Sequence, residues 1–590
     1  MELHAAQTFC FFISLLCLRV AADQPDVSPN VLTAPEVHTT LGALRGLQLN
    51  VKGTDTRVHA YLGVPFAKPP IGPSRRLRAP QPIEGWEGVR DATKQPLICI
   101  QGKKRNLEIL EKMSGMLMDI PDVSEDCLYL NIFTPANRDE DAKLPVRNCN
   151  CWNKNVGWKT LMCFIPLQVM VWIHGGGFSF GFASMYDGSA MAAYQDVVVV
   201  VIQYRLGLLG FLSTGDEQMS GNFGLLDQIQ ALRWTKQHIH NFGGDPDLVT
   251  IFGESAGGVS VSLLLLSPLS DGLFQRAIAE SGTAAIDLIM SDNPFPLTQA
   301  IANGTGCSIK STEEIGDCMR NLDLDSIMAI AEDVQIRYTI NVDGHFLKKS
   351  VDELFEKHEL LTIPFMTGFN SDEGGWLMAD FFGISNWTEG FDRNEFRKML
   401  SMFFPGTGDD FKIDLLTEEY IGTGKDRVKN RKGFTEFLGD LVFNLPAIKT
   451  ANAHRDAGAD VYLYEYKYPP RFLKKNRPDF VGSDHGDEIF MVLGFCFLTK
   501  NVGLVDPCPE EEVEFSKTMM NYWGNFARTG SPNGEGLTHW PKYGGDEKYM
   551  GLDLKSESGH QLKKDRFVFM THTLPEKIKE HQQKTEHVEL

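Results

Sequence analysis

A serine with a glycine two residues to either side is the feature of this sequence best suited to chemistry. Ser255 follows the apolar stretch 249–252 and lies in Gly253-Glu254-Ser255-Ala256-Gly257. This spacing is typical of a nucleophile elbow, a sharp strand-to-helix turn in which small neighbours allow the serine a strained backbone conformation. The helix predicted at 256–266 would direct its free N–H groups at a developing oxyanion. Alone, the pentapeptide also fits an ordinary Gly-Ser turn.

The sequence around Ser255 favours the catalytic interpretation. The cluster 242–246 ends a helix predicted at 225–239 and restarts the chain as the strand that leads to Ser255. Further upstream, His174-Gly175-Gly176-Gly177 follows the apolar strand 169–173. These glycines can direct consecutive backbone N–H groups into a pocket, and a serine nucleophile needs such donors for its oxyanion. A plain glycine-rich turn is the alternative.

Alternating strands and helices predict an α/β fold with a mostly parallel sheet covered by helices. The β-branched run 197–202 is typical of a strand buried on both faces, and 277–280, 365–369 and 461–466 are further strand candidates. Because the chain has no Pro/Gly/Ser-rich linker, repeat or low-complexity tract, we predict one large domain at 23–586.

Both ends of the sequence resemble targeting signals. An apolar core at 11–18 followed by Val20-Ala21-Ala22 predicts a secretory signal peptide at 1–22, because the core is too short to span a bilayer. The last four residues, His587-Val588-Glu589-Leu590, are similar to the retrieval signals of the endoplasmic reticulum lumen. A retrieval receptor is therefore a predicted partner, and the lumen of the reticulum is the predicted location. We expect no transmembrane segment.

Cysteine usage fits an oxidising compartment. Cys99 and Cys127 flank one loop and Cys307 and Cys318 a shorter one, so two disulfides are expected there. Cys496 and Cys508 can pair or stay free. Asn303 and Asn386 begin glycosylation sequons, which must lie at the surface.

The formal net charge of −20 is spread along the chain. Basic residues cluster at 103–105 and 474–477 only, so nucleic acid is not expected as a partner.

Several motifs together resemble the type-B carboxylesterase and cholinesterase family, and most closely the lumenal carboxylesterases of vertebrates. They are the block 124–131 (Ser-Glu-Asp-Cys-Leu-Tyr-Leu-Asn), the glycines after His174, and Phe-Gly-Gly-Asp-Pro running into Gly-Glu-Ser-Ala-Gly. The similarity extends from 63–67 to 522–530. It implies an α/β-hydrolase fold whose insertions form a gorge over the active site, an oxyanion hole made by Gly176, Gly177 and Ala256, and neither a cofactor nor a metal.

The resemblance also implies the partners of Ser255. The acid should follow a strand between the serine and the histidine, and 365–370 is such a strand. Glu373 matches the family's acid, and Asp372 beside it is the competitor. His485, between glycines 482 and 486, matches the catalytic histidine. His454 lies in a polar helical stretch, so we interpret it as a surface histidine, together with His560, His572, His581 and His587.

The expected function is therefore hydrolysis of small carboxylic esters, xenobiotic or lipid, with amides and thioesters as further substrates. A cholinesterase is one alternative. Family cholinesterases hold the choline cation on a tryptophan in the first disulfide loop, whereas 99–127 here contains no Phe, Tyr or Trp. A non-catalytic adhesion module of the neuroligin kind is the other alternative, but this chain keeps all three members of the triad.

Residues 146–168 interrupt the family pattern. Relatives run from Lys-Leu-Pro, here 143–145, straight into the strand that begins at Val169. The insert carries Cys149, Cys151 and Cys163 beside large apolar groups, a mixture that exposed loops rarely show. Its first two residues can be encoded by a splice-donor sequence, and its last five by a pyrimidine tract that closes on CAG. The hypothesis is a retained intron; a surface loop of one lineage is the alternative.

Overall fold

The computed structural model describes residues 34–588, except for 105–111, 113–115, 119, 137–145, 154–156, 165–166, 334–335, 385, 405–409, 476 and 500–501. The chain divides into Met1–Pro35 and one compact unit, Glu36–Leu590. The signal peptide predicted at 1–22 lies outside the described residues, as do Glu589 and Leu590 of the predicted retrieval signal. Among the described helices, none is long and apolar enough to cross a membrane.

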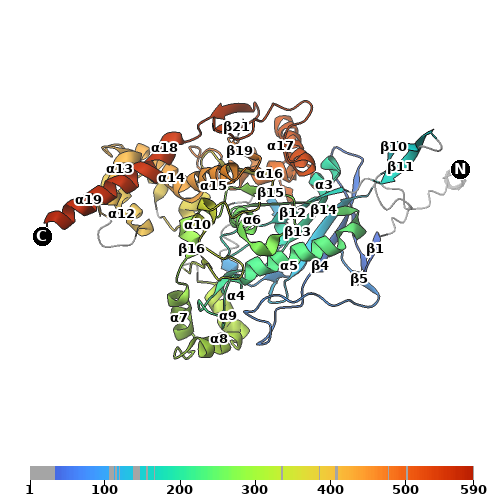
Figure 1. Cartoon of the computed structure of the whole chain (residues 1–590), viewed down its shortest axis with the longest axis horizontal. Helices are drawn as coiled ribbons and strands as arrows, with labels where there is room; N and C mark the ends of the chain where they lie inside the picture. The colour runs from blue at the N-terminus through green and yellow to red at the C-terminus, as the bar shows by residue number, and fades with distance from the viewer. Residues whose placement is uncertain are drawn as a thin grey trace, which may run out of the picture. The chain divides into compact units, whose positions relative to one another are not determined.

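An eleven-stranded mixed sheet is the framework of the unit Glu36–Leu590 (Figure 1). The strand order is β22-β21-β19-β18-β15-β14-β12-β13-β9-β4-β3. All pairings from β21 to β13 are parallel, and the pairings toward both edges are antiparallel. The bounds are β3 Leu47–Asn50, β4 Arg57–Pro65, β9 Tyr129–Pro135, β12 Leu167–Ile173, β13 Val198–Ile202, β14 Gly244–Glu254, β15 Arg276–Glu280, β18 Phe365–Asn370, β19 Val461–Tyr466, β21 Lys548–Leu552 and β22 Glu557–His560.

Helices follow the parallel strands along the chain. They are α3 Ser189–Gln195, α4 Gly207–Phe211, α5 Phe223–His238, α6 Ala256–Leu266, α7 Phe295–Gly304, α8 Thr312–Arg320, α9 Leu324–Ala331, α10 Val351–Glu356, α11 Leu377–Phe381, α12 Arg393–Phe403, α13 Asp410–Ile421, α14 Arg427–Gly439, α15 Leu445–Asp456, α16 Asp487–Val492, α17 Glu510–Thr529, α18 Lys564–Val568 and α19 Leu574–Val588. Short strands form small sheets: β1 Glu36–Thr39, β2 Gly42–Arg45 and β5 Val89–Asp91; β6 Ile98–Cys99 and β8 Val123–Ser124; β7 Met116–Met118 and β20 Val502–Leu504; β16 Met290–Ser291 and β17 Ile340–Asn341.

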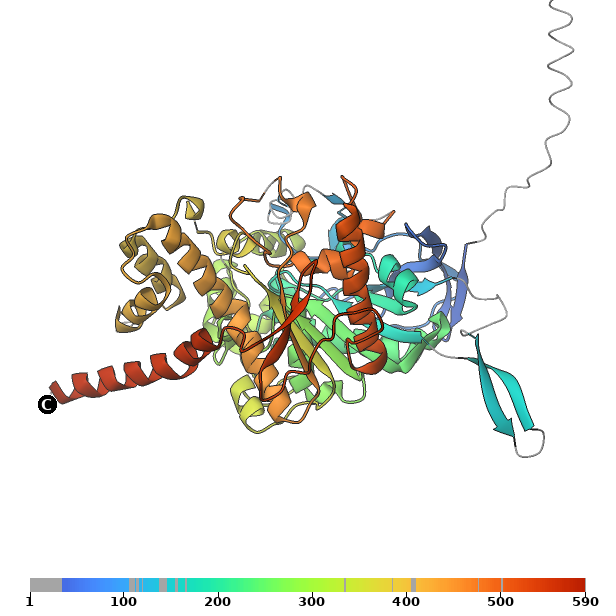
Figure 2. The ribbon, with the colours of Figure 1, turned by 90° about the horizontal axis from the view of Figure 1, so that it is seen from above.

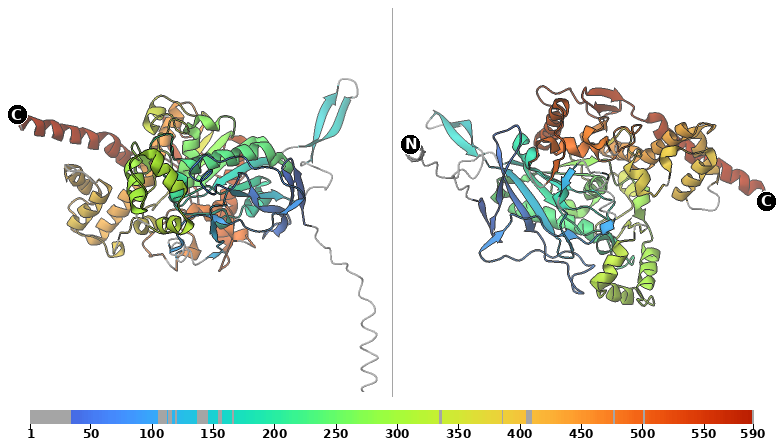
Figure 3. Two further views of the ribbon diagram at one scale, coloured as in Figure 1. Left: turned by 90° about the horizontal axis from the view of Figure 1, so that it is seen from below. Right: turned by 180° about the vertical axis from the view of Figure 1, so that it is seen from behind.

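Alternate side chains of the central strands enter two separate apolar cores. On β12, Val169, Val171 and Ile173 join the core that contains the buried residues of α5 and α6. Met170 and Trp172 point to the other core, which contains residues of α3, α16 and α17. The views from below and behind show helices on both faces of the sheet (Figure 3). A strand covered on both faces needs apolar side chains at every position, which explains the continuous apolar runs in the sequence.

The expected elements around the site are found close to their predicted positions. The five strand candidates correspond to β12, β13, β15, β18 and β19, and the helix 256–266 is α6. The helix predicted at 225–239 is α5, followed by a 3-10 turn at Ile239–Phe242. β14 begins at Gly244, well before the apolar run at 249, because Gly244 already pairs with Leu167 of β12. The predicted mostly parallel α/β fold is confirmed.

Three disulfides are present among the described residues. Cys99–Cys127 and Cys307–Cys318 confirm the two expected pairs. Cys496 and Cys508, which the sequence leaves undecided, also form a disulfide. Asn303 and Asn386 are both exposed, as glycosylation at the two sequons requires.

The insert at 146–168 contains a hairpin that is separate from the central sheet. β10 Val146–Asn153 pairs with β11 Gly157–Phe164 in antiparallel register, and the two form a sheet of their own (Figure 2). The last two residues of the insert, Leu167 and Gln168, belong instead to β12. In the sequence, the hairpin therefore comes immediately before the strand that leads to His174 and its glycines.

Candidate active site

Ser255 occupies the sharp turn between β14 and α6. Its backbone angles are φ 56° and ψ −124°, a conformation that few residues other than glycine adopt. The turn packs against the end of β12, because a Cβ on Gly257 would lie 2.0 Å from the carbonyl oxygen of Ile173 and one on Gly253 2.4 Å from the same atom. The Ser255 N–H is held by the Glu280 carbonyl at 2.9 Å. Glycine at both flanking positions is thus a steric requirement of the elbow.

The glycines after His174 form a tight loop beside this turn. Gly176 and Gly177 have φ values of 108° and 58°, and a Cβ on Gly176 would lie 2.1 Å from the Phe180 carbonyl oxygen. A Cβ on Gly175 would lie 2.9 Å from the Cβ of Ser255, so the loop touches the elbow. Within the described ranges, no acceptor binds the N–H groups of Gly176, Gly177 and Ala256. Three donors in this neighbourhood are therefore available to a ligand.

His485 lies between two carboxylates. Its Nδ1 is 2.6 Å from Glu373 Oε2, and its Nε2 is 3.1 Å from Oε1 of Glu254, the residue before the serine. The ring stacks on Phe443 with 4.2 Å between ring centroids. Among the described residues, no hydrogen bond joins Ser255 Oγ to His485 Nε2. The contact with Glu254 nevertheless places the imidazole beside the elbow.

Glu373 is 1% exposed, and its other oxygen accepts the Asn370 N–H at 2.7 Å. Asp372, the competing acid, lies elsewhere. Its carboxylate accepts the Gly482 N–H at 2.9 Å, and its own N–H donates to the Ser483 carbonyl. Glu373 therefore contacts the imidazole, whereas Asp372 holds the loop that presents it.

Asp484 also joins the loop that carries His485 to the loop that carries Glu373. Its two carboxylate oxygens accept the N–H groups of Trp376 and Leu377, each at 3.0 Å. Burial raises the pKa of Asp484 to about 7. Next to it, Asp487 forms a buried ion pair with Arg477, which also donates to the Gly482 carbonyl. The two loops are thus tied by backbone and side-chain contacts before any substrate binds.

Buried carboxyl groups surround this pair of loops. Glu488 accepts from Ser281 Oγ at 3.0 Å and from Asn370 Nδ2 at 2.6 Å, and Glu280 accepts from Trp523 Nε1 at 2.8 Å. Sequence reasoning missed these two residues and the contact made by Glu254. The one signal was the glutamate directly before the proposed nucleophile, since nothing local in the sequence indicates that Glu280 or Glu488 is buried close to Glu254.

Burial and the charges of neighbouring groups together determine the pKa values of the ionisable side chains in the site. Burial raises the pKa of Glu254, and the nearby His485 opposes that change. Burial and the charges of Glu254 and Glu373 raise the pKa of Glu488. Burial also disfavours a charged His485, but Glu254 and Glu373 together outweigh it and raise the pKa of the imidazole. The protonated form of His485 is therefore stabilised by two carboxylates rather than one.

One interpretation of a histidine from the sequence is wrong. His454, expected at the surface, is fully buried on α15, where it packs against Phe365 with 4.5 Å between ring centroids. Neither ring nitrogen has a hydrogen-bond partner among the described residues, and burial lowers the pKa of His454 to about 3. Polar neighbours along the helix concealed one apolar face. His560, His572 and His581 are exposed, as expected, and the side chain of His587 lies outside the described residues.

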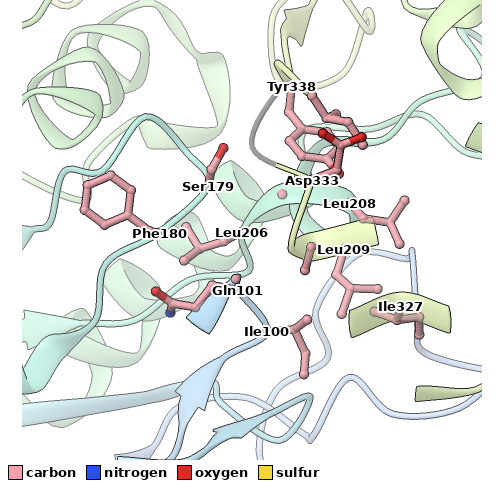
Figure 4. Close-up of a pocket in the computed structure, with 14 residues that line it drawn as sticks. Ile100, Gln101, Ser179, Phe180, Leu206, Leu208, Leu209, Ile327, Asp333 and Tyr338 are labelled. Atoms are coloured by element: carbon pink, nitrogen blue, oxygen red, sulfur yellow. The ribbon is translucent and has the colours of Figure 1, made fainter. Parts of the chain in front are cut away.

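A pocket opens beside the glycine loop (Figure 4). Ser179, Phe180 and Gln101 contribute to its wall, together with apolar residues of 206–209 and 327–338. Ser255, Glu373 and His485 are not among the residues that line it. The pocket therefore borders the loop that contains Gly176 and Gly177 without including the proposed nucleophile.

A serine elbow at the end of a parallel strand, with a histidine and an acid on loops after later strands, defines an α/β-hydrolase. The chain matches the family model described as the carboxylesterase family over residues 33–570. It is 43% identical over 554 residues to pyrethroid hydrolase Ces2e of Rattus norvegicus, with 93% of this chain and 91% of that protein covered. It belongs to the carboxylesterase family and is a carboxylic ester hydrolase.

Two further relatives agree with this assignment. The medium-chain fatty acyl-CoA hydrolase precursor of Anas platyrhynchos is 41% identical over 545 residues, which cover 91% of each chain. The cocaine esterase of Homo sapiens is 40% identical over 599 aligned residues, which cover 100% of each. The similarity therefore extends over nearly the whole sequence.

Replacing Glu254 by glutamine should lower the pKa of His485. The substitution keeps the size of the side chain but removes one of the two negative charges that stabilise the imidazolium, so the proton is lost at lower pH. Titration of histidine-labelled protein by heteronuclear NMR measures the pKa directly. Glu535→Gln, at an exposed position, is the matched control and should leave it unchanged. An unchanged or higher pKa in Glu254→Gln would contradict the assigned cause.

Proposed function

We propose that Ser255, Glu373 and His485 are the nucleophile, the acid and the base of an esterase that works through an acyl-enzyme. The observation that carries this proposal is the buried contact of 2.6 Å between His485 Nδ1 and Glu373 Oε2, on an imidazole whose other nitrogen lies beside the serine elbow. A carboxylate on Nδ1 fixes the tautomer in which Nε2 can accept a proton.

In the proposed reaction, Ser255 Oγ attacks the ester carbonyl carbon while its proton passes to His485 Nε2. The tetrahedral intermediate collapses, the bond to the alcohol oxygen breaks, and His485 returns the proton to the leaving alcohol. Water then attacks the acyl-enzyme and gives its proton to His485. The carboxylic acid product leaves, and His485 returns the proton to Ser255 Oγ. General base assistance of this kind contributes about 10²–10⁴ in rate.

Gly176, Gly177 and Ala256 are proposed as the oxyanion hole. Their N–H groups are without acceptors among the described residues, and two of them belong to the loop that touches the elbow. Ala256 is the first residue of α6, whose N-terminus adds a favourable dipole. The loss of one such donor typically costs roughly 2.7–4 kcal/mol of transition-state stabilisation.

Small carboxylic esters, xenobiotic or lipid, are the proposed substrates, with thioesters and amides as further candidates. The names of the relatives, a pyrethroid hydrolase and a fatty acyl-CoA hydrolase, support an ester and thioester range. Choline esters are the weaker alternative, because residues 99–127 offer no aromatic side chain for a quaternary ammonium group. A purely adhesive, neuroligin-like role is disfavoured by the complete set of catalytic side chains.

We also propose that the protein enters the secretory pathway through a signal peptide at 1–22 and is retrieved to the endoplasmic reticulum lumen through 587–590. Disulfides at Cys99–Cys127 and Cys307–Cys318 and the exposed sequons at Asn303 and Asn386 support an oxidising, glycosylating compartment.

Residues 146–168 are proposed to be a retained intron, absent from the working enzyme. Its removal would put Leu144 and Pro145 in the places of Leu167 and Gln168. Leu167 is buried and its N–H donates to the Gly243 carbonyl, a role that another leucine can fill. Gln168 lies at a register shift, and its buried amide oxygen has no partner in the described part of the chain. Proline there would remove an unsatisfied polar group.

Ser255→Ala should abolish ester hydrolysis and lower turnover by roughly 10⁶, because the triad acts as a unit. Folding should be retained, which circular dichroism checks beside a nitrophenyl ester assay. Ser262→Ala is the matched control on the same helix, since its buried hydroxyl has no partner among the described residues. Near-normal hydrolysis by Ser255→Ala would disprove the proposed nucleophile.

Deletion of 146–168 should raise the yield of active enzyme, because it removes three extra thiols and joins residues 143–145 directly to the strand before the glycine loop. A variant with Cys149, Cys151 and Cys163 replaced by serine serves as the control that separates thiol mispairing from strain in β12. Sequencing of transcripts gives the independent test. The proposal is wrong if every transcript encodes the insert and the deletion variant is inactive.

Removal of residues 587–590 should send the protein into the culture medium as an active glycoprotein, because the retrieval receptor then has nothing to bind. Replacement of the four residues by Lys-Asp-Glu-Leu is the control and should keep it inside the cell. Immunoblots and esterase assays of medium and lysate measure the distribution. Equal secretion of the full-length and truncated forms would show that the tail is not an address.

A further inference from the structure

Gln101 joins the first disulfide loop to the loop that contains Gly176 and Gly177. It lies two residues after Cys99 and is 1% exposed. Its side-chain amide makes two hydrogen bonds to one residue: Nε2 donates to the Gly181 carbonyl at 3.1 Å, and Oε1 accepts the Gly181 N–H at 3.0 Å. The same Nε2 also donates to the Cys99 carbonyl at 3.0 Å. A buried, fully paired amide of this kind fixes the relative position of two loops.

Gly181 is the point at which the glycine loop folds back on itself. Its φ is 113°, and a Cβ there would lie 2.5 Å from His174 Nδ1 and 2.6 Å from the Gly175 carbonyl oxygen. Between these two ends, the Gly176 carbonyl accepts the N–H groups of Ser179 and Phe180. The two hydrogen bonds from Gln101 therefore hold Gly181, which packs against His174 and Gly175 at the beginning of the loop. Gly175 directly precedes Gly176, the first proposed oxyanion donor.

Two further anchors of the loop come from the chain that follows β13. The Gly207 N–H donates to the Phe178 carbonyl at 2.7 Å, and Tyr204 Oη donates to the His174 carbonyl at 2.8 Å. Gln101 is the anchor that comes from the disulfide loop, and Gln101 and Phe180 both line the pocket beside the glycine loop (Figure 4). The loop is thus held from two sides by different parts of the chain.

We propose that Gln101 is a positioning residue for the oxyanion hole, through which the Cys99–Cys127 loop sets the direction of the Gly176 and Gly177 N–H groups. The proposal rests on the proposed serine esterase reaction. The hydrogen bonds of Gln101 go to Cys99 and Gly181, and none of them reaches Ser255. Gln101 acts through Gly181, so its loss should weaken binding of the transition state more than binding of the ground-state ester.

The first test is Gln101→Met, which keeps the length of the side chain but removes both hydrogen bonds to Gly181. Because small misplacements of reacting groups can cost on the order of 10²-fold, kcat should fall by roughly 10- to 100-fold while KM changes by less than about threefold. The inhibition constant of an alkyl trifluoromethyl ketone, which forms an oxyanion on the serine, should rise by the same factor as kcat falls. The inhibition constant of the matching methyl ketone should not change.

The second test uses pH. In Gln101→Glu a protonated carboxyl can donate to the Gly181 carbonyl and accept from its N–H, as the amide does, whereas an ionised one has no proton to donate. Activity relative to the wild type should therefore increase as pH falls for Gln101→Glu and stay constant for Gln101→Met. A role in folding alone would not produce this difference, and it decides the question even if Gln101→Met folds poorly.

Gln195→Met is the matched control. Gln195 is also a buried glutamine with a bonded amide, which pairs with Asn521 and Arg528 on α17. It should keep the wild-type kcat and trifluoromethyl ketone affinity. The inference is overturned if Gln101→Met retains both within about twofold, or if the relative activity of Gln101→Glu does not change with pH. Activity in Ser255→Ala would instead overturn the proposed reaction.

Discussion

The closeness of the Ile173 carbonyl to the serine turn is the constraint on which the site depends. β12 and β14 are parallel neighbours whose ends must nearly touch, and side chains at 253 or 257 would occupy the space of that carbonyl. Glycine at both positions lets the start of α6 pack against β12, which also carries His174 into the glycine loop. The same contact thus sets the position of the nucleophile and of its proposed oxyanion donors. A sheet covered on both faces keeps the two strand ends from moving apart.

Charge imposes the second constraint. The imidazole is buried with two carboxylates on its two nitrogens, and further carboxyl groups at Glu280 and Glu488 lie close behind. Four ionised carboxylates in so small a volume would repel one another strongly. The raised pKa values of Glu254, Glu280 and Glu488 reduce this repulsion by favouring their neutral forms. For the proposed mechanism this matters because a neutral Glu254 leaves His485 freer to act as a base than a charged one does.

The features of the fold that depend on residues close together in the sequence could be predicted. Apolar runs gave the central strands within a few residues, and the spacing of Gly253, Ser255 and Gly257 predicted the turn, since burial and backbone geometry act on neighbouring residues. The partners of Ser255 came from the family resemblance, because nothing near Glu373 or His485 reveals that they meet. His454 was misread for a related reason. Its helix, α15, is polar on average. The face that carries His454 is nevertheless buried, because it packs against Phe365 of β18, which is distant in the sequence.

Contacts between distant parts of the chain explain why the rest could not be read from the sequence. Gln101 meets Gly181 across 80 positions, and Asp484 meets Trp376 across 108. Each contact uses an ordinary polar residue whose role exists only after the sheet has formed. This dependence also bears on the insert at 146–168. Among the described residues, β10 and β11 pair only with each other, whereas the last two residues of the insert, Leu167 and Gln168, belong to β12, the strand that leads to His174. From Val169 onward, β12 is buried and runs directly into the glycine loop. The anchors at Gly181 and Phe178 hold the loop from its far side, so the position of the proposed oxyanion hole depends both on the strand that enters the loop and on the contacts that hold its far end.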